Sequence, residues 1–336
     1  MVTSTTRDDY LPHGASKVGS RRTRLAALTT RLTLRPMTNR LPTSQRGIEF
    51  SRRLVATSMN LFGPVPKGTG VDLVADGPVR GEWVRAPGLT PGPRVILYIH
   101  GSAYVICSAR THRGLTARLS AATGLPVFTV DYRLAPEHPF PAAADDLEAA
   151  YRWLLDQGYD ASNIVIAGDS AGGHLAADLI IENDRTGTPQ PGALVLFSPL
   201  IDLDFELSAR MERTRKDPMI SAKAARGLVA LYTDGHDADL PRLRLDLGRV
   251  RELPPTLIQV GGAEMLRGDA RHLHSMIDAA GGEAELEIWP DQMHVFQALP
   301  RLIPEADRAL EHAAAFIADA LENQALQHDS KGQVSR

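Results

Sequence analysis

The sequence predicts an α/β protein whose central, mostly parallel sheet is covered by helices on both faces. Five continuous apolar runs support this prediction, because strands that are buried on both faces are apolar throughout. Stretches with helical periodicity separate the runs, as expected when helices connect parallel strands. The runs are residues 95–99, 127–130, 164–167, 193–197 and 257–260, and the helical stretches lie near 113–122, 143–156, 172–184 and 268–280.

Length and composition indicate a folded globular protein. The 336 residues are 43% apolar and 23% charged, ordinary values that argue against disorder or a coiled coil. The net charge of −3 gives no overall field that would attract nucleic acid, so we expect no nucleic-acid partner. The charge is uneven, because residues 1–53 hold eleven Arg and Lys against three acidic residues.

The cysteine content and the absence of long apolar runs predict a cytoplasmic location. Cys107 is the single cysteine, which excludes an internal disulfide, and we interpret it as a small buried residue. No Cys and His residues have the spacing of a zinc site, and we expect neither a metal nor a cofactor. No apolar run approaches the roughly 18 residues that span a bilayer. The best candidate for a secretion core begins at Leu25 and is interrupted by Arg31.

Residues 64–322 are the predicted main domain. They begin with a hairpin signal at 71–85 and continue through the apolar runs. An alternating strand at 284–288 and a closing helix at 304–322 complete the domain. Residues 204–250 interrupt the strand rhythm and predict an inserted helical segment.

The ends of the chain differ from this domain. Residues 1–20 and 323–336 lack periodicity and predict mobile tails. Residues 21–63 predict two helices before the main domain. Their arginines suggest either a surface that approaches lipid or the solvated face of covering helices, and we favour covering helices because single leucine stripes make weak membrane anchors. The stripe in the first helix consists of Leu25, Leu28 and Leu32.

The strongest functional signal is Gly-Asp-Ser-Ala-Gly at residues 168–172, between a buried strand and a helix. A serine in such a turn has a strained backbone, and the flanking glycines remove side chains that would clash. Ser170 is therefore the predicted nucleophile, at the sheet's carboxyl edge over a helix N-terminus that favours negative charge. The alternative is a turn that only joins strand to helix, which the order of the elements disfavours.

A second motif, His-Gly-Ser-Ala-Tyr, ends the buried strand at 95–99. The backbone amides of Ser102 and Ala103, with that of Ala171, are predicted to form an oxyanion hole. Losing one such donor typically costs about 3–4 kcal/mol of transition-state stabilisation. Tyr104 and Asp169, which adjoin these motifs, are the predicted substrate-binding residues.

A serine nucleophile needs an imidazole to take its proton and a carboxylate to orient that imidazole. His294 follows the last predicted strand, on a loop at the same sheet edge, and is the predicted base. Two carboxylates after the strand at 256–260 compete as the acid. Glu264 lies in the loop and is preferred, whereas Asp269 lies near the start of the next helix and could cap it.

Four blocks together resemble the hormone-sensitive lipase family of α/β-hydrolases, in its bacterial esterase branch. The resemblance covers about residues 64–322, and the blocks occur in the family's order. They are His-Gly-Ser-Ala-Tyr from residue 100, Asp-Tyr-Arg-Leu-Ala-Pro-Glu-His-Pro-Phe-Pro-Ala from 131, Gly-Asp-Ser-Ala-Gly-Gly from 168, and Leu-Pro-Pro-Thr-Leu-Ile-Gln-Val-Gly from 253 with Glu264 and His294-Val-Phe.

The resemblance implies the α/β-hydrolase fold, a helical cap and a serine carboxylester hydrolase that forms an acyl-enzyme. Its implied substrates are small to medium acyl esters, with lactones and lipid-derived esters included. The family's nucleophile, base and acid fall on Ser170, His294 and Glu264. The family's oxyanion loop is usually His-Gly-Gly-Gly, and Ser102 and Ala103 replace the last two glycines, so positive φ angles there would be strained.

The resemblance also implies that the block from residue 131 braces the His-Gly loop. The N-terminal helices and the insertion after Pro199 would form the cap over the nucleophile. The expected partner is a small-molecule ester, and because relatives often pair, a homodimer is left open.

Two other functions are compatible with these residues. Related proteins hydrolyse amides or formamides with the same machinery. A plant hormone receptor resembles the family yet lacks the catalytic histidine, so a non-catalytic small-ligand binding protein is the other alternative. The presence of His294 favours catalysis.

Overall fold

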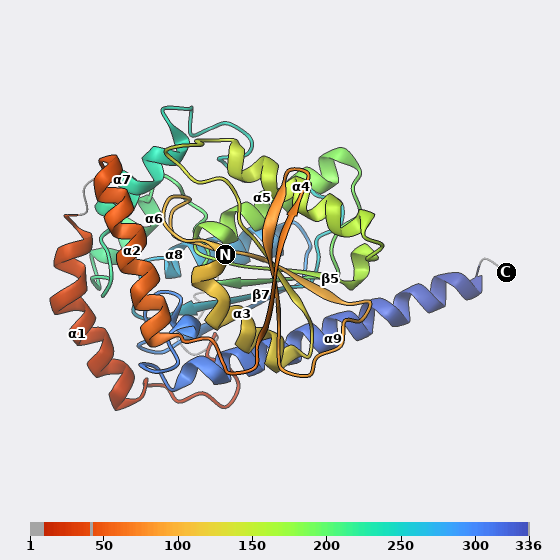
Figure 1. The fold of residues 1–336 in the computed structure, drawn as a ribbon, viewed down its shortest axis with the longest axis horizontal. Coiled ribbons are helices and arrows are strands. Elements are labelled where there is room, and N and C mark those ends of the chain that lie inside the picture. The colour runs from red at the N-terminus through yellow and green to blue at the C-terminus, as the bar shows by residue number, and fades with distance from the viewer. Residues whose placement is uncertain (1–9, 41–42, 335–336) are drawn as a thin grey trace.

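An eight-stranded sheet with helices on both faces forms the body of the protein, in a computed structural model that describes residues 10–40 and 43–334 (Figure 1). The strands are β1 Gly70–Asp76, β2 Val79–Arg85, β3 Val95–Ile99, β4 Val127–Val130, β5 Ile164–Asp169, β6 Ala193–Phe197, β7 Thr256–Gly261 and β8 Ala284–Trp289. The helices are α1 Arg21–Thr38, α2 Gln45–Phe62, α3 Ala109–Thr123, α4 Ala142–Asp156, α5 Ala171–Thr186, α6 Glu206–Glu212, α7 Ala222–Thr233, α8 Arg267–Ala279 and α9 Glu305–Val334.

The strand order is β1-β2-β4-β3-β5-β6-β7-β8. The β1–β2 and β2–β4 pairs are antiparallel, and the other five pairs are parallel. This confirms the predicted α/β fold, including the hairpin. Strand β3 lies between β4 and β5, so the direction in which the sheet grows reverses at β3. In such sheets, ligands bind beyond the carboxyl ends of the strands at the point of reversal.

The continuous apolar strands are explained by two helical layers. Ile96 and Tyr98 of β3 pack in the core shared with α3 and α9, whereas Leu97 and Ile99 face the core shared with α4, α5 and α8. Figure 1 shows these two sets of helices on opposite sides of the strands. All five β3 residues are fully buried, and each buried apolar side chain of this size contributes roughly 1.5–3 kcal/mol.

The helices expected in 21–63 are α1 and α2, and the insertion expected at 204–250 contains α6 and α7. Each of α1, α2 and α7 is preceded by a serine whose side chain accepts a hydrogen bond from a backbone amide of the first turn, the usual N-cap. In the described ranges, no helix combines the length and apolar character that crossing a membrane requires.

The closing helix is longer than expected. We placed its end at residue 322 and a mobile tail at 323–336, but α9 continues to Val334. Residues 323–334 lack an apolar stripe because the end of α9 projects from the body of the protein (Figure 1). A helix that does not pack against the protein needs no apolar face. Its Ala, Leu and Gln residues are good helix formers, which explains why the helix continues.

The described part of the N-terminal tail also differs from expectation, because it packs against the domain. The carbonyl of Tyr10 accepts a hydrogen bond from the amide of Ile288 at 2.7 Å, beside the sheet edge. The amide of Ser20 donates to the Glu305 carboxylate at 2.8 Å. These contacts link distant parts of the chain, which sequence periodicity does not detect. Residues 1–9 of the expected tail lie outside the described residues.

Candidate active site

Ser170 lies in a strained turn between β5 and α5. Its backbone has φ 54° and ψ −120°, a conformation that costs a residue with a side chain about 1–3 kcal/mol. Its amide donates to the carbonyl of Phe197 at 3.0 Å, which fixes the turn to β6. A Cβ atom on Gly172 would lie 2.1 Å from the carbonyl oxygen of Ile99, so only glycine allows α5 to approach β3 this closely.

Three of the predicted residues form one hydrogen-bonded chain. Nδ1 of His294 lies 2.6 Å from a carboxylate oxygen of Glu264. Because an ionised carboxylate only accepts hydrogen bonds, Nδ1 carries the proton and Nε2 is the acceptor. The Ser170 hydroxyl donates to Nε2, with Oγ and Nε2 separated by 3.0 Å. The structure thus brings together residues separated by 124 positions in the sequence.

The pKa of the His294 imidazole is raised above its ordinary value of 6.5. Burial favours the neutral form and would lower the pKa, but the negative charges of Glu264, Asp217 and Asp169 outweigh burial. The imidazole therefore accepts a proton more readily than a free histidine. A stronger base suits the removal of a hydroxyl proton.

Glu264 is held in place by two further donors. Its other carboxylate oxygen accepts hydrogen bonds from the Ser198 hydroxyl and the Gly261 amide, both at 2.6 Å. The Ser198 oxygen also accepts a hydrogen bond from the amide of Val295, next to His294. Our sequence reasoning missed Ser198, although its position directly after β6 placed it at the right sheet edge.

A buried carboxylate, Asp217, was also missed. It is 1% exposed, and its Oδ2 accepts a hydrogen bond from the amide of Met265, the residue after Glu264. Burial raises the pKa of Asp217 to about 6. The residue lies in the insertion, far from the motifs, so nothing local in the sequence linked it to His294.

Asp269, the alternate acid, lies elsewhere. Its carboxylate accepts hydrogen bonds from the amides of Ile201 and Asp202 and from the Ser208 hydroxyl, at 2.9–3.1 Å. It forms no bond to His294, and burial raises its pKa to about 7. The alternative is therefore wrong: Asp269 joins the loop after β6 and helix α6 to α8, instead of capping its own helix.

The predicted oxyanion loop has three consecutive residues at positive φ: 76° at Ser102, 54° at Ala103 and 64° at Tyr104. Each costs roughly 1–2 kcal/mol relative to the right-handed region. The strain at Ser102 and Ala103 was expected, because they replace glycines of the family, whereas the strain at Tyr104 was not. Among the described residues, none accepts a hydrogen bond from the amides of Ser102, Ala103 or Ala171. A Cβ on Gly101 would lie 2.7 Å from that of Ser170, so the loop adjoins the serine.

The Asp-Tyr-Arg block braces this loop, as the resemblance implied. The Tyr132 hydroxyl donates to the carbonyl of His100 at 2.8 Å, and the two rings stack with centroids 4.2 Å apart. The amide of Ala135 donates to the carbonyl of Tyr104 at 3.0 Å.

Cys107 is buried, as expected, and burial raises the pKa of its thiol to about 11, so the thiol is neutral.

Neither residue that we expected to bind substrate is exposed. Tyr104 is fully buried, and its ring stacks on Tyr232 of α7 with centroids 3.9 Å apart. Asp169 is 2% exposed; its carboxylate accepts a hydrogen bond from the Tyr98 hydroxyl at 2.8 Å and lies 3.2 Å from Nε2 of His112. This corrects the prediction: Tyr104 packs against the cap helix, and Asp169 supports the turn behind Ser170.

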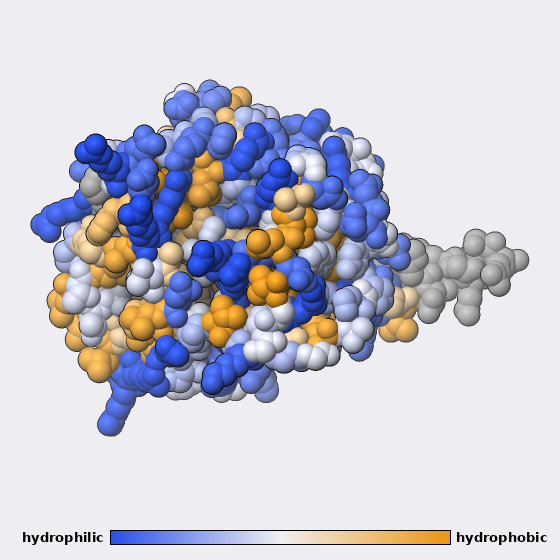
Figure 2. Space-filling view, viewed as in Figure 1, coloured by the Kyte–Doolittle hydropathy of each residue, from blue (hydrophilic) through white to orange (hydrophobic). Residues whose placement is uncertain are grey.

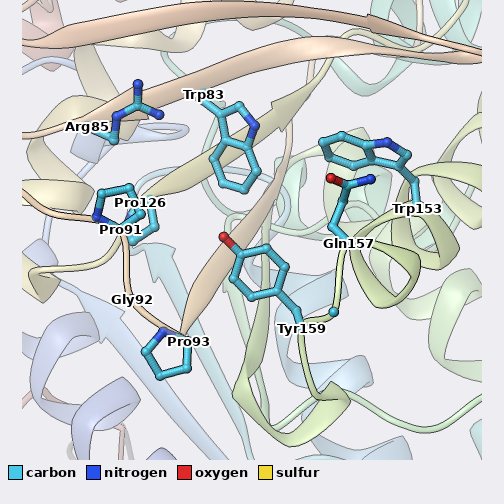
Figure 3. A pocket seen from close by; sticks show the side chains of 10 residues that line it. Trp83, Arg85, Pro91, Gly92, Pro93, Pro126, Trp153, Gln157 and Tyr159 are labelled. Carbon is cyan, nitrogen blue, oxygen red and sulfur yellow. The ribbon is translucent and has the colours of Figure 1, made fainter.

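A separate cleft of about 490 Å³ is lined by Trp83, Trp153 and Tyr159 (Figure 3). It also includes Pro93 and Pro126, which precede β3 and β4. The cleft is therefore at the amino ends of these strands, opposite the edge that holds Ser170. We do not place the active site there.

A strained serine that follows a parallel strand, and that is hydrogen-bonded through histidine to a buried carboxylate, is the arrangement found in serine hydrolases. Comparison with known proteins agrees with this class. Residues 96–298 match a family described as the alpha/beta hydrolase fold.

Individual relatives are similar over most of their length. An acetyl-hydrolase of Streptomyces hygroscopicus is 39% identical over 256 residues, covering 76% of this chain and 84% of that protein. The carboxylesterase/phospholipase LipF of Mycobacterium tuberculosis is 36% identical over 328 residues, covering 90% and 83%. A crystal structure of an esterase from the bacterial hormone-sensitive lipase family has a TM-score of 0.82 at 35% identity, covering 90% of this chain and 99% of that one. The chain belongs to the alpha/beta hydrolase family, in its hormone-sensitive lipase branch, and is a hydrolase.

Proposed function

We propose that the protein is a serine carboxylester hydrolase in which Ser170 is the nucleophile, His294 the general base and Glu264 the acid that orients it. The observation that carries this proposal is the continuous chain from the Ser170 hydroxyl through the imidazole to a buried carboxylate, with bonds of 3.0 and 2.6 Å. Similarity to named esterases supports the reaction type.

The chemistry follows from these contacts. Ser170 Oγ attacks the ester carbonyl carbon while Nε2 of His294 takes the hydroxyl proton, and Glu264 stabilises the imidazolium that forms. The amides of Ser102, Ala103 and Ala171 hold the negative oxygen of the tetrahedral intermediate. The imidazolium then gives its proton to the departing alcohol, which leaves an acyl-enzyme. Water, deprotonated by His294, hydrolyses the acyl-enzyme and restores Ser170.

The proposed substrates are esters with small to medium acyl groups. This range of acyl lengths is the one that the resemblance to the bacterial esterase branch implies. The names of the relatives, acetyl-hydrolase and carboxylesterase/phospholipase, support ester chemistry. Cytoplasmic location and homodimerisation remain predictions from the sequence.

Steady-state kinetics with nitrophenyl acetate, butyrate and octanoate, beside an aryl formamide, test the reaction type. We expect kcat/KM to be highest for acetate or butyrate and much lower for octanoate and the formamide. Preference for the formamide would favour amide hydrolysis instead. If none of these substrates is turned over, the proposal is contradicted and the non-catalytic ligand-binding protein is favoured instead.

Ester hydrolysis is expected to have an acid limb with its midpoint above pH 6.5. Only a neutral imidazole can take the Ser170 proton, and the pKa of His294 is raised above 6.5. As pH falls through this pKa the imidazole becomes charged, and kcat/KM falls about tenfold per pH unit. A kcat/KM profile with a non-ionising ester measures the midpoint. A midpoint clearly below that of free histidine would contradict this account of the site.

A further inference from the structure

Helix α1 exposes its apolar stripe to solvent. Leu25, Leu28 and Leu32 lie on one face and are 64%, 53% and 68% exposed, whereas the one buried residue of α1, all of which is described, is Thr23. This leucine stripe therefore faces away from the rest of the protein. Figure 2 shows apolar side chains at the left of the molecule, over α1 and α2.

Arginines flank this stripe. At about 100° per residue, Arg24 and Arg31 lie on one side of the leucines and Arg22 on the other, all exposed. Residues 21–62 hold nine Arg and one Glu, an excess of +8, against −11 for the rest of the chain. Among the described residues, two of these arginines are paired with carboxylates, Arg35 and Arg52.

An apolar groove of about 590 Å³ lies between α1 and α2. Leu25 borders both the exposed stripe and this groove, and Arg22 and Arg301 line the groove as well. The groove extends to Met219 and to Met293, the residue before His294. Apolar surface with an arginine rim therefore runs from the outside of α1 toward the predicted base.

The helix pair is fixed firmly to the domain. Arg35 pairs with Glu212 at 2.7 Å, and Arg52 forms two hydrogen bonds of 2.8 Å to the Glu137 carboxylate. The Thr38 hydroxyl donates to the carbonyl of Met219. The three side chains that make these contacts are half-buried, and Leu25, Leu28 and Leu32 stay exposed.

We propose that α1 and α2 form a docking surface for an anionic phospholipid bilayer. An apolar stripe flanked by arginines matches the acyl and phosphate layers of such a surface. The charge argues against a second copy of this chain, because two such faces, each with exposed arginines at 22, 24 and 31, would repel one another. Docking would place the groove that leads toward His294 next to the lipid. The proposal does not depend on the assignment of the triad.

Co-sedimentation of the full-length protein with vesicles tests the proposal. We expect the protein to pellet with phosphatidylglycerol–phosphatidylcholine vesicles, to pellet poorly with pure phosphatidylcholine, and to be released at high salt. The leucine variant L28Q/L32Q should bind at least about tenfold more weakly. The variant R21Q/R24Q/R31Q, which replaces three exposed arginines of α1, should bind as weakly and lose most of its salt dependence.

The controls carry leucine-to-glutamine and arginine-to-glutamine changes elsewhere. L73Q alters a leucine on β1 that is 75% exposed, and R152Q/R185Q/R249Q removes three exposed arginines outside α1 and α2. Both should bind vesicles like the wild type, and hydrolysis of a soluble ester checks folding. Absence of vesicle binding by the wild type, or equal loss in the controls, would overturn the proposal. A wild-type dimer that L28Q/L32Q dissociates would assign the stripe to a second copy instead.

Discussion

Replacing Ser170 by alanine is expected to reduce kcat for ester hydrolysis by a factor on the order of 10⁶. The hydroxyl is the atom that bonds to the acyl group in the proposed mechanism, and no other group in the hydrogen-bonded chain can replace it. His294→Ala should cause a similar loss, and the double variant should be little worse than either, because the two residues act as one unit. Steady-state kinetics with nitrophenyl acetate measure the effect.

The control is Ser198→Ala, which removes the hydroxyl that supports Glu264 at 2.6 Å and leaves Ser170 in place. This variant should retain far more activity than Ser170→Ala, because loss of one hydrogen bond to a charged group costs about 1.5–3 kcal/mol. A Ser170→Ala protein with substantial activity would show that Ser170 is not the nucleophile. Equal losses in the two variants would contradict the limited role given to the Ser198 hydroxyl.

Glu264→Gln is expected to lower kcat by about 10³–10⁴-fold while the protein stays folded. A glutamine cannot stabilise the imidazolium, and its amide group can force the wrong tautomer on His294. The acid limb of the pH profile should also move to lower pH, because Glu264 is the strongest of the charges that raise the pKa of His294. Kinetics across the pH range measure both effects.

Asp269→Asn is the matched control, a carboxylate-to-amide change in the same segment. Its carboxylate bonds the amides of Ile201 and Asp202 and the Ser208 hydroxyl, away from His294. We expect kcat near that of the wild type and a free energy of unfolding reduced by about 1–3 kcal/mol. A large fall in kcat for Asp269→Asn with little effect of Glu264→Gln would reverse the assignment of the acid.

The fold could be predicted because its signals are local. Strands buried on both faces must be apolar throughout, so residues 95–99 and 193–197 could be recognised without neighbours. Ser170 could be predicted for the same reason, because the glycines around it, the strand before and the helix after are contiguous in the sequence. Glu264 was preferred to Asp269 as the acid because of its position alone: Glu264 lies in the loop after the strand, whereas Asp269 lies near the start of the next helix.

Other features depend on contacts between distant segments. Ser198 and Asp217 reach Glu264 and its neighbour from β6 and from the insertion, and neither lies in a motif. Tyr104 and Asp169 adjoin motifs, but the local sequence does not predict in which direction a side chain points where the backbone is strained. The exposed leucine stripe of α1 could not be predicted for a similar reason. Periodicity identifies an apolar face of a helix, but it does not show whether the rest of the protein covers that face.

Labelling with a fluorophosphonate probe, followed by peptide mass spectrometry, reports both whether a serine of this protein is activated and which serine it is. We expect a single adduct on Ser170, formed by the wild type and by Asp269→Asn and lost when His294 is replaced by alanine. Labelling at another serine, or a failure of the folded wild type to react, would contradict the proposal that Ser170 is the nucleophile.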